Sequence, residues 1–221
     1  MSRHGTVSMD QRTALLETSP QPSLPFVSSR IVVFSDFNCP YCFTLNEWLA
    51  ELGVSDRVRW VGIEHKPDLP TQGENRSADA TLLREEVADV GRRAPDLGVT
   101  VPRFWANSRE ALLLQNAVED DDPEVAPRLR RVIFRRYWRD GGMPFGVEAL
   151  EEILGGLSID KPIVEPEYLE EMTDWWRAEL DRIPVMVAPT GVTHLGLQDK
   201  KRVRAFLHSA IRPSTAGPGC R

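Results

Sequence analysis

The stretch Ser35-Asp36-Phe37-Asn38-Cys39-Pro40-Tyr41-Cys42 decides the fold of this 221-residue chain. The apolar run Ile31-Val32-Val33-Phe34 that precedes it predicts a buried strand. Apolar residues spaced through Phe43 to Leu52, which follow it, predict a helix. The cysteines therefore lie where a strand turns into a helix. We expect Cys39 at the N-cap and Pro40 at the first helical position, where the missing N–H of proline costs nothing.

This placement gives the two cysteines different expected roles. Cys42 becomes the third helical residue, and its backbone N–H is expected to point back towards the Cys39 sulfur. Free N–H groups and the positive end of the helix dipole both favour a thiolate there. We therefore expect Cys39 to be the reactive thiol, with a pKa below the ordinary cysteine value. Cys42, one turn into the helix, is expected to be sheltered and to close a disulfide with Cys39.

Three interpretations of the cysteine pair compete. Two cysteines separated by two residues can be half of a zinc site, which needs two further ligands. The remaining candidates are scattered along the chain: His4, His65, His194, His208 and Cys220. The pair can also be two inert buried side chains, or a redox dithiol. A proline between the cysteines at a helix start favours the dithiol.

Composition and charge restrict the function classes. The chain has 41% hydrophobic and 27% charged residues, which is typical of a globular protein, and its net charge of −6 argues against a general nucleic-acid binder. No apolar run is long enough to span a membrane. Residues 1–30 lack a signal-peptide core and predict a loosely ordered leader, so the cytoplasm is the expected location. A dithiol motif there is more often catalytic than structural.

The rest of the chain predicts an α/β core that is interrupted by helices. Val58 to Ile63 reads as a second strand, parallel to the first in a βαβ unit. Strands are also expected at Ile183 to Val187 and Val192 to Leu195, before a last helix at Lys200 to Ile211 capped by Asp199. Residues 31–70 and 181–212 would form the core. A helical insertion would occupy residues 71–180. Residues 1–30 would form a leader, and residues 213–221 a tail in which Cys220 is incidental.

Three stretches of the sequence resemble a known family. The cysteine motif resembles the active-site stretch of the DsbA-like family of the thioredoxin superfamily. Asn107 to Ala111 resembles the Asn-Thr-x-x-Ala helix start, and Phe134 to Gly141 the aromatic-rich segment, of its cytoplasmic branch. That branch includes FrnE and the 2-hydroxychromene-2-carboxylate isomerases. The resemblance implies a thioredoxin fold with a helical insertion between the second and third core strands.

The resemblance also implies roles for individual residues. Cys39 would be the nucleophile and Cys42 the resolving cysteine, with Pro40 and Tyr41 contacting substrate. Pro184 stands where the family has a cis-proline beside the cysteines, and the backbone of Ile183 would dock an extended substrate. The lead-in before Pro184 departs from the family's Gly-Val-x-x-Val-Pro pattern.

The expected function is thiol–disulfide exchange with a disulfide- or dithiol-containing substrate, without a metal or cofactor, and with glutathione as a possible electron partner. The alternative is a glutathione-dependent isomerase or transferase of the chromene-carboxylate isomerase or kappa-class type. This chain departs from those enzymes at Cys39, where they typically carry serine. In favour of the alternative, Gln198 and Asp199 at a helix start could bind the γ-glutamyl end of glutathione. A non-catalytic interaction domain is a third interpretation, and it leaves the cysteine motif without a purpose.

Two groups of charged or polar residues have two interpretations each. Glu64 and His65, at the end of the second strand, can act functionally, by tuning the thiol or contacting substrate, or simply form a solvated strand end. The arginines between 128 and 139 can bind an anion or form a solvated basic helix face. In both cases the solvated interpretation is favoured.

Overall fold

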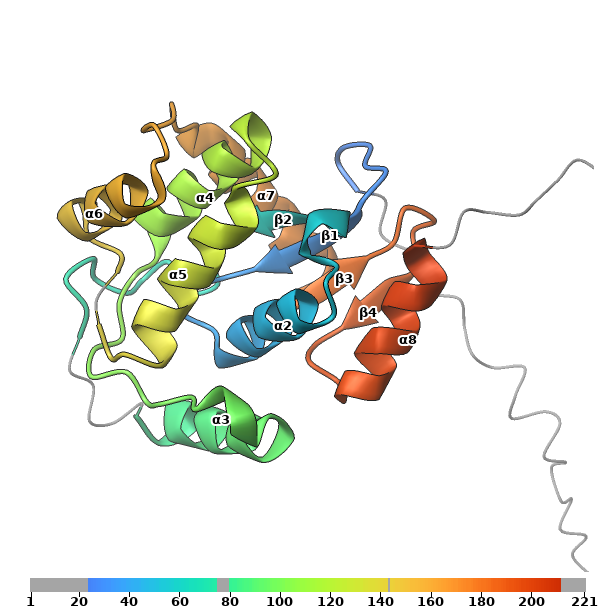
Figure 1. The fold of residues 1–221 in the computed structure, drawn as a ribbon, viewed down its shortest axis with the longest axis horizontal. Helices are drawn as coiled ribbons and strands as arrows, with labels where there is room; N and C mark the ends of the chain where they lie inside the picture. The colour runs from blue at the N-terminus through green and yellow to red at the C-terminus, as the bar shows by residue number, and fades with distance from the viewer. Residues whose placement is uncertain (1–23, 75–79, 143, 212–221) are drawn as a thin grey trace, which may run out of the picture.

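The chain folds into a four-stranded sheet covered by helices on both faces (Figure 1). The computed structural model describes residues 24–74, 80–142 and 144–211. Residues 1–23, which make up most of the expected leader, and the tail with Cys220 lie outside the described residues. In the described part of the chain no helix is long and apolar enough to cross a membrane.

The elements follow the predicted order, with boundaries that shift by a few residues. The strands are β1 (Ile31–Ser35), β2 (Val58–Gly62), β3 (Val185–Val187) and β4 (Thr193–Leu195). The helices are α2 (Pro40–Glu51), α3 (Ala80–Arg93), α4 (Arg109–Asp121), α5 (Ala126–Trp138), α6 (Val147–Leu157), α7 (Pro166–Glu179) and α8 (Lys200–Ile211).

The strand order in the sheet is β2-β1-β3-β4. β1 pairs with β2 in parallel, with Ile31 opposite Val58 and Ser35 opposite Gly62, as the predicted βαβ unit requires. β3 runs antiparallel to both β1 and β4. This arrangement is an α/β thioredoxin fold in which the helices α3 to α7 are inserted in the sequence between β2 and β3. The predicted fold class is therefore confirmed.

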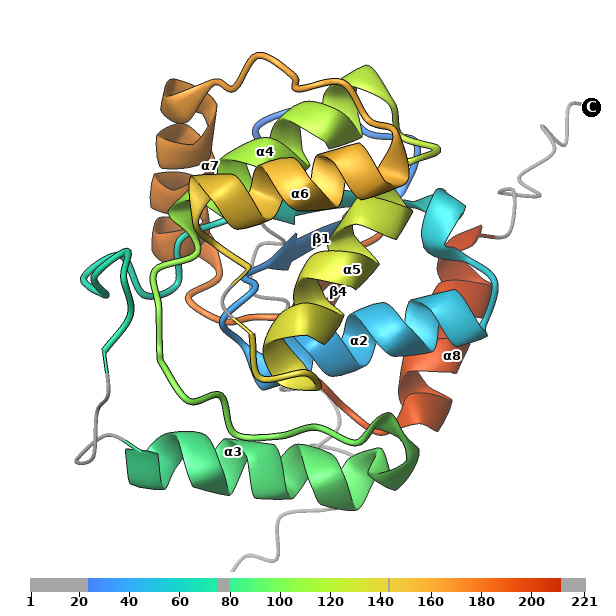
Figure 2. The same ribbon diagram turned by 60° about the vertical axis from the view of Figure 1, so that its left-hand side comes forward.

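The side chains of β1 alternate between two hydrophobic clusters. Ile31 and Val33 pack with α2, α8 and most of the inserted helices, whereas Val32 and Phe34 face α7 on the other side of the sheet. Figures 1 and 2 show the sheet between α7 and the pair α2 and α8. Burial of each such aliphatic or aromatic side chain stabilises the fold by about 1.5–3 kcal/mol. A strand buried on both faces explains the unbroken apolar run in the sequence.

The inserted helices share the main cluster with the sheet. Helix α4 lies along β2, and the Asn116 side chain accepts the Gly62 N–H at 2.7 Å and donates to the Gly62 carbonyl at 3.2 Å. The amide thus satisfies backbone groups at the open edge of β2. The division of the chain into a core and a helical insertion at residues 71–180 remains a prediction. Helical spacing of the apolar residues in the sequence would place Leu82 and Val147 on inner helix faces, but in the structure they are exposed by 55% and 53%.

Most arginines of α5 are held by carboxylates. Glu47 on α2 accepts hydrogen bonds from Arg131 and Arg135, which ties α2 to α5 and lowers the pKa of Glu47 against the effect of burial. The solvated interpretation is wrong for Arg130, which is fully buried over the Trp60 ring and paired with Glu119 at 3.4 Å. Arg130 is therefore part of the core.

Candidate active site

The cysteine pair lies at the junction of β1 and α2, where the sequence predicts it. Cys39 is the N-cap of α2, with extended backbone angles (φ −108°, ψ 120°), and Pro40 occupies the first turn. Both thiols are free. Cys39 keeps 5% of its surface exposed, whereas Cys42 is fully buried. Only Cys39 therefore has access to the surface.

The prediction that the pKa of Cys39 lies below the ordinary cysteine value is wrong. Burial is the largest effect and raises the pKa of the Cys39 thiol well above its ordinary value. A hydrogen bond with the Cys42 side chain, the charge of Cys42 and the carboxylate of Glu86 act in the same direction. The backbone N–H of Cys42 does point at the Cys39 sulfur and lowers the pKa, as expected, but this one group does not outweigh the desolvation of the thiolate.

Asp36 holds the loop that carries the cysteines. Its carboxylate accepts hydrogen bonds from the backbone N–H of His65 at 2.8 Å, the backbone N–H of Asn38 at 3.3 Å and the hydroxyl of Ser108. These donors come from the end of β2, the motif itself and the start of α4. Burial is the largest effect on Asp36 and raises its pKa from 3.8 to about 6, in spite of the three hydrogen bonds.

A cavity of about 380 Å³ opens beside Cys39. Its walls come from the start of α2, the end of β2, helix α3, the residues before β3 and the residues after β4. The lining residues are Cys39, Tyr41, His65, Glu86, Arg93, Arg182, Ile183, Gly196 and Leu197. This volume lies within the range of small-molecule sites.

The cavity brings together some of the predicted site residues. Cys39, Tyr41 and Ile183 line it, although they are far apart in the sequence. Pro40, Cys42 and Pro184 are buried and are not among its lining residues. The Ile183–Pro184 peptide bond is cis, as the resemblance implies. The Pro184 carbonyl accepts the N–H of Gly196 at 2.8 Å, which joins the residues before β3 to those after β4.

The two residues at the end of β2 separate in the structure. The His65 ring lines the cavity and packs edge-on against Trp176, with ring centroids 6.1 Å apart. Burial, followed by the charge of Lys66, lowers the pKa of His65 to about 4, so its imidazole is neutral at pH 7. Glu64 is buried and ion-paired with Arg109. The solvated-end interpretation is therefore wrong for Glu64.

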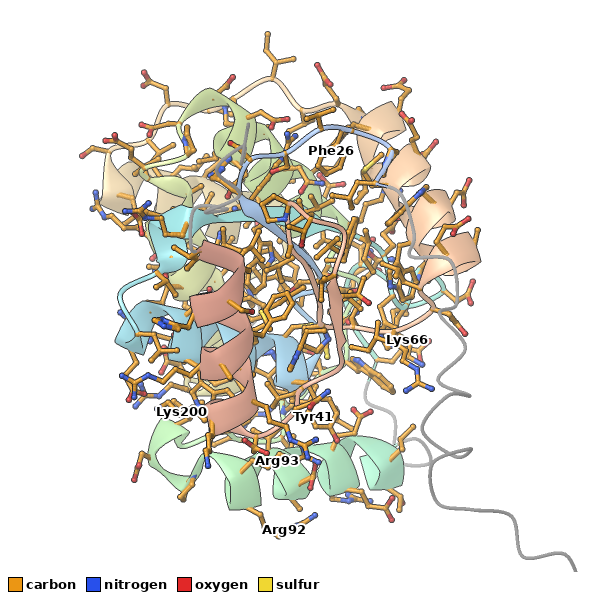
Figure 3. All side chains as sticks on the ribbon, turned by 90° about the vertical axis from the view of Figure 1, so that its right-hand side faces the viewer. Phe26, Tyr41, Lys66, Arg92, Arg93 and Lys200 are labelled. Atoms are coloured by element: carbon orange, nitrogen blue, oxygen red, sulfur yellow. The ribbon has the colours of Figure 1, made fainter. Side chains whose placement is uncertain are left out.

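Helix α3 supplies a wall of the cavity that the sequence analysis missed. Asp89 accepts hydrogen bonds from the Tyr41 hydroxyl at 3.4 Å and from Arg93 Nε at 2.7 Å. Arg93 Nη1 also donates to the Leu197 carbonyl at 2.8 Å. Figure 3 shows Tyr41 and Arg93 close together where α3 meets α2. A polar stripe of Glu86, Asp89 and Arg93 beside the apolar stripe of this helix was the available signal.

Two other candidates receive little support from the geometry. Among residues 24–74, 80–142 and 144–211, no three His, Cys, Asp or Glu side chains form a group that could hold a metal ion. Gln198 and Asp199 are not among the residues that line the cavity. The Asp199 carboxylate accepts the Arg202 N–H at 2.9 Å and so acts as the predicted cap of α8, and Gln198 accepts from the Arg202 side chain.

Similar folds occur among solved structures. A probable DsbA oxidoreductase from Streptomyces coelicolor has a TM-score of 0.60 at 17% identity, over 83% of this chain and 91% of that one. A 2-hydroxychromene-2-carboxylate isomerase has a TM-score of 0.60 at 18% identity, over 81% and 93%. The cytosolic disulfide reductase DsbM from Pseudomonas aeruginosa has a TM-score of 0.52 at 16% identity, over 81% and 97%. At these identities the similarity establishes the fold alone.

The comparison with curated proteins gave no match. A family model, described as the DSBA-like thioredoxin domain, matches residues 30–166. The matched segment begins just before β1, contains the cysteine motif and ends at the start of α7. Because it spans more than half of the sequence, the chain belongs to the DSBA-like thioredoxin domain family.

Proposed function

We propose that this protein is a thiol–disulfide oxidoreductase that uses Cys39 and Cys42. The observation that carries the proposal is the unequal burial of two adjacent free thiols at a helix N-terminus. Cys39 faces the cavity, and Cys42 is fully buried next to it. An accessible nucleophile beside a protected second thiol is the arrangement that thiol–disulfide exchange requires.

The proposed reaction moves two electrons and two protons. Cys39 loses its thiol proton and attacks a substrate disulfide, whose first sulfur leaves as a thiolate and is protonated by water. Cys42 then loses its proton and attacks the Cys39 sulfur in the mixed disulfide. The second substrate sulfur leaves, so the substrate is reduced and the Cys39–Cys42 pair is oxidised. The reverse sequence oxidises a substrate dithiol.

The backbone of Ile183 supports substrate docking in this proposal. Ile183 lines the same cavity as Cys39 and Tyr41 and precedes the cis bond to Pro184. An extended substrate can form strand-like hydrogen bonds there, while Tyr41 contacts its side chains. We include glutathione as the electron partner and the cytoplasm as the setting. Two equivalents of reduced glutathione would reset the oxidised pair.

The test uses serine variants in a Cys220→Ser background, which removes the third thiol. Cys42→Ser is expected to accumulate a mixed disulfide on Cys39, because the resolving attack is lost, and to lose most dithiol–disulfide turnover. Cys39→Ser should form no mixed disulfide. Intact-protein mass spectrometry with and without dithiothreitol measures both outcomes. A mixed disulfide on Cys42 in the Cys39→Ser variant would reverse the proposed roles.

The second candidate is a glutathione-dependent isomerase or transferase acting on a small molecule. The cavity volume favours it, since about 380 Å³ can enclose a compact aromatic substrate. The same Cys42→Ser variant separates the two functions. An isomerase needs one position to orient the glutathione sulfur, so it would keep its activity without Cys42. Full glutathione-dependent turnover of an aromatic substrate by this variant, without any trapped mixed disulfide, would replace the first proposal.

A further inference from the structure

The carboxylate of Glu86 lies in the wall of the cavity and has no hydrogen-bond or ion-pair partner among the described residues. It lies on α3, is half-buried, and lines the same cavity as Cys39. Among the residues that the structure describes, Glu86 forms no hydrogen bond and no ion pair. Arg93, about two turns further along α3, is already held by Asp89 and by the Leu197 carbonyl. Glu86 therefore keeps its charge available to whatever enters the cavity.

The positively charged side chains near the cavity form no ion pair with Glu86 among the described residues. The Lys66 ammonium lies over the Trp105 ring, 5.6 Å from its centroid, and acts on Glu86 only through its field. Arg182 lines the wall that precedes β3 and is exposed to solvent, which weakens its field. His65 is neutral at pH 7. Burial raises the pKa of Glu86, because removing the carboxylate from water without a partner destabilises its charged form.

Glu86 also acts on the nucleophile. Its carboxylate is one of the groups that raise the pKa of the Cys39 thiol, because a negative charge nearby disfavours the thiolate. A positive group placed against Glu86 would cancel this repulsion. Such a group on a substrate would therefore be attracted to the cavity and would ease ionisation of Cys39 at the moment of binding.

We propose that Glu86 makes Cys39 selective for disulfides that carry a positive charge close to their sulfur atoms. This preference rests on the proposed thiol–disulfide exchange. An ammonium or guanidinium group of the substrate pairs with Glu86 and brings the adjacent disulfide to Cys39. The exchange then proceeds as above: Cys39 attacks, the first substrate sulfur leaves with a proton from water, and Cys42 releases the second.

Three small symmetrical disulfides test this preference. Cystamine carries two ammonium groups, bis(2-hydroxyethyl) disulfide is neutral, and 3,3′-dithiodipropionate carries two carboxylates. The reduced protein is mixed with each at pH 7 and low salt, and each second-order rate constant is divided by that of dithiothreitol with the same disulfide. We expect cystamine to react at least about tenfold faster than dithiodipropionate on this scale, the size of effect expected for one close charge pair.

Glu86→Gln should reduce this ratio to within about threefold, since the amide keeps the shape of the side chain and removes its charge. Glu85→Gln is the matched control, because Glu85 is the exposed neighbour on the same helix, and it should leave the ratio unchanged. Salt gives a second measurement on the unaltered protein. Raising the ionic strength should slow cystamine and leave the neutral disulfide unaffected.

The outcomes separate this preference from the proposed function. An unchanged ratio in Glu86→Gln, or a preference for dithiodipropionate in the unaltered protein, overturns the role of Glu86. The second result would assign selectivity to Arg182. Exchange with the neutral disulfide but without any dependence on charge removes the preference alone. A protein that exchanges with none of the three disulfides loses both proposals.

Discussion

Two carboxylates lie in or near the cysteine motif, and they differ in their burial and their hydrogen bonds. Asp36, in the motif itself, is 1% exposed and accepts three hydrogen bonds from three different elements. Glu86, on α3, is half-buried and forms no hydrogen bond with the described residues. Burial raises the pKa of both groups. The same chemical group therefore supports the architecture at Asp36 and, in our proposal, substrate binding in the cavity at Glu86.

The difference shows what a hydrogen-bond inventory says about role. The oxygens of Asp36 already accept from Ser108, His65 and Asn38, so they have little capacity left for a substrate. An unpartnered carboxylate costs stability in the free protein and becomes useful when a ligand arrives. We therefore expect changes at Asp36 to appear mainly in folding, and changes at Glu86 mainly in substrate choice.

The largest expected effect is that of Asp36→Ala on stability. The change leaves two buried donors and one part-buried donor without an acceptor, and removal of the buried charge offsets only part of that cost. We expect the free energy of unfolding at pH 7 to fall by about 3–5 kcal/mol. Urea titration followed by tryptophan fluorescence measures it. Ser108→Ala, which removes one of the donors, should cost about 1 kcal/mol. A loss below 1 kcal/mol in Asp36→Ala would contradict the structural role.

The pH dependence of stability gives the next largest effect. Asp36 has a pKa of about 6 in the folded protein against 3.8 as its ordinary value, so the folded state holds this proton more tightly. Its contribution to stability is fully present below pH 3.8 and is lost as the pH rises through 6. This difference corresponds to about 3 kcal/mol.

Asp36→Asn, which cannot titrate at this position, isolates the effect. The free energy of unfolding of the unaltered protein minus that of Asp36→Asn should fall by about 2.5 kcal/mol between pH 4 and pH 7, because the carboxyl of the unfolded chain is already partly ionised at pH 4. Urea titrations at pH intervals of about 0.5 provide the curve. A flat difference across this range would show that the Asp36 carboxylate is not desolvated.

The smallest expected effect is that of Glu86→Gln on stability. Because Glu86 has no partner among the described residues, its replacement removes only a half-buried charge. We expect the free energy of unfolding at pH 7 to stay the same or to rise by less than about 1 kcal/mol. The same urea titration measures it. A loss of more than about 1 kcal/mol would give Glu86 a structural role and remove its contrast with Asp36.

Much of the fold follows from local sequence. The apolar run before Cys39 and the Pro40 after it place the cysteines at a strand-to-helix junction, and the structure confirms both. The apolar stripes of α4 and α7 also face inward, as the helical spacing of their apolar residues indicates. Leu82 and Val147 are exceptions, because each lies at the first turn of a helix, where the apolar stripe extends beyond the surface that covers it.

The site was predicted in part. Cys39, Tyr41 and Ile183 were identified from the motif and the resemblance, and His65 was considered as a strand-end residue. Glu86, Arg93 and Arg182 were not identified. Glu86 and Arg93 belong to a polar helix stripe, which in a sequence looks the same whether it faces water or a cavity. Arg182 lies in an irregular segment that has no periodicity to interpret.

The sequence by itself determined where the two cysteines of the proposed redox pair lie and how the chain begins its core. These properties depend on neighbours within one or two helical turns, where the periods of strand and helix and the chemistry of a cap act directly. Only the tertiary structure decided the charge around Cys39. The helix cap predicts a lowered pKa, whereas burial among distant elements and the carboxylate of Glu86, 47 positions later in the chain, raise it. Desolvation and through-space charge depend on what surrounds the thiol in three dimensions, and local sequence does not contain that information.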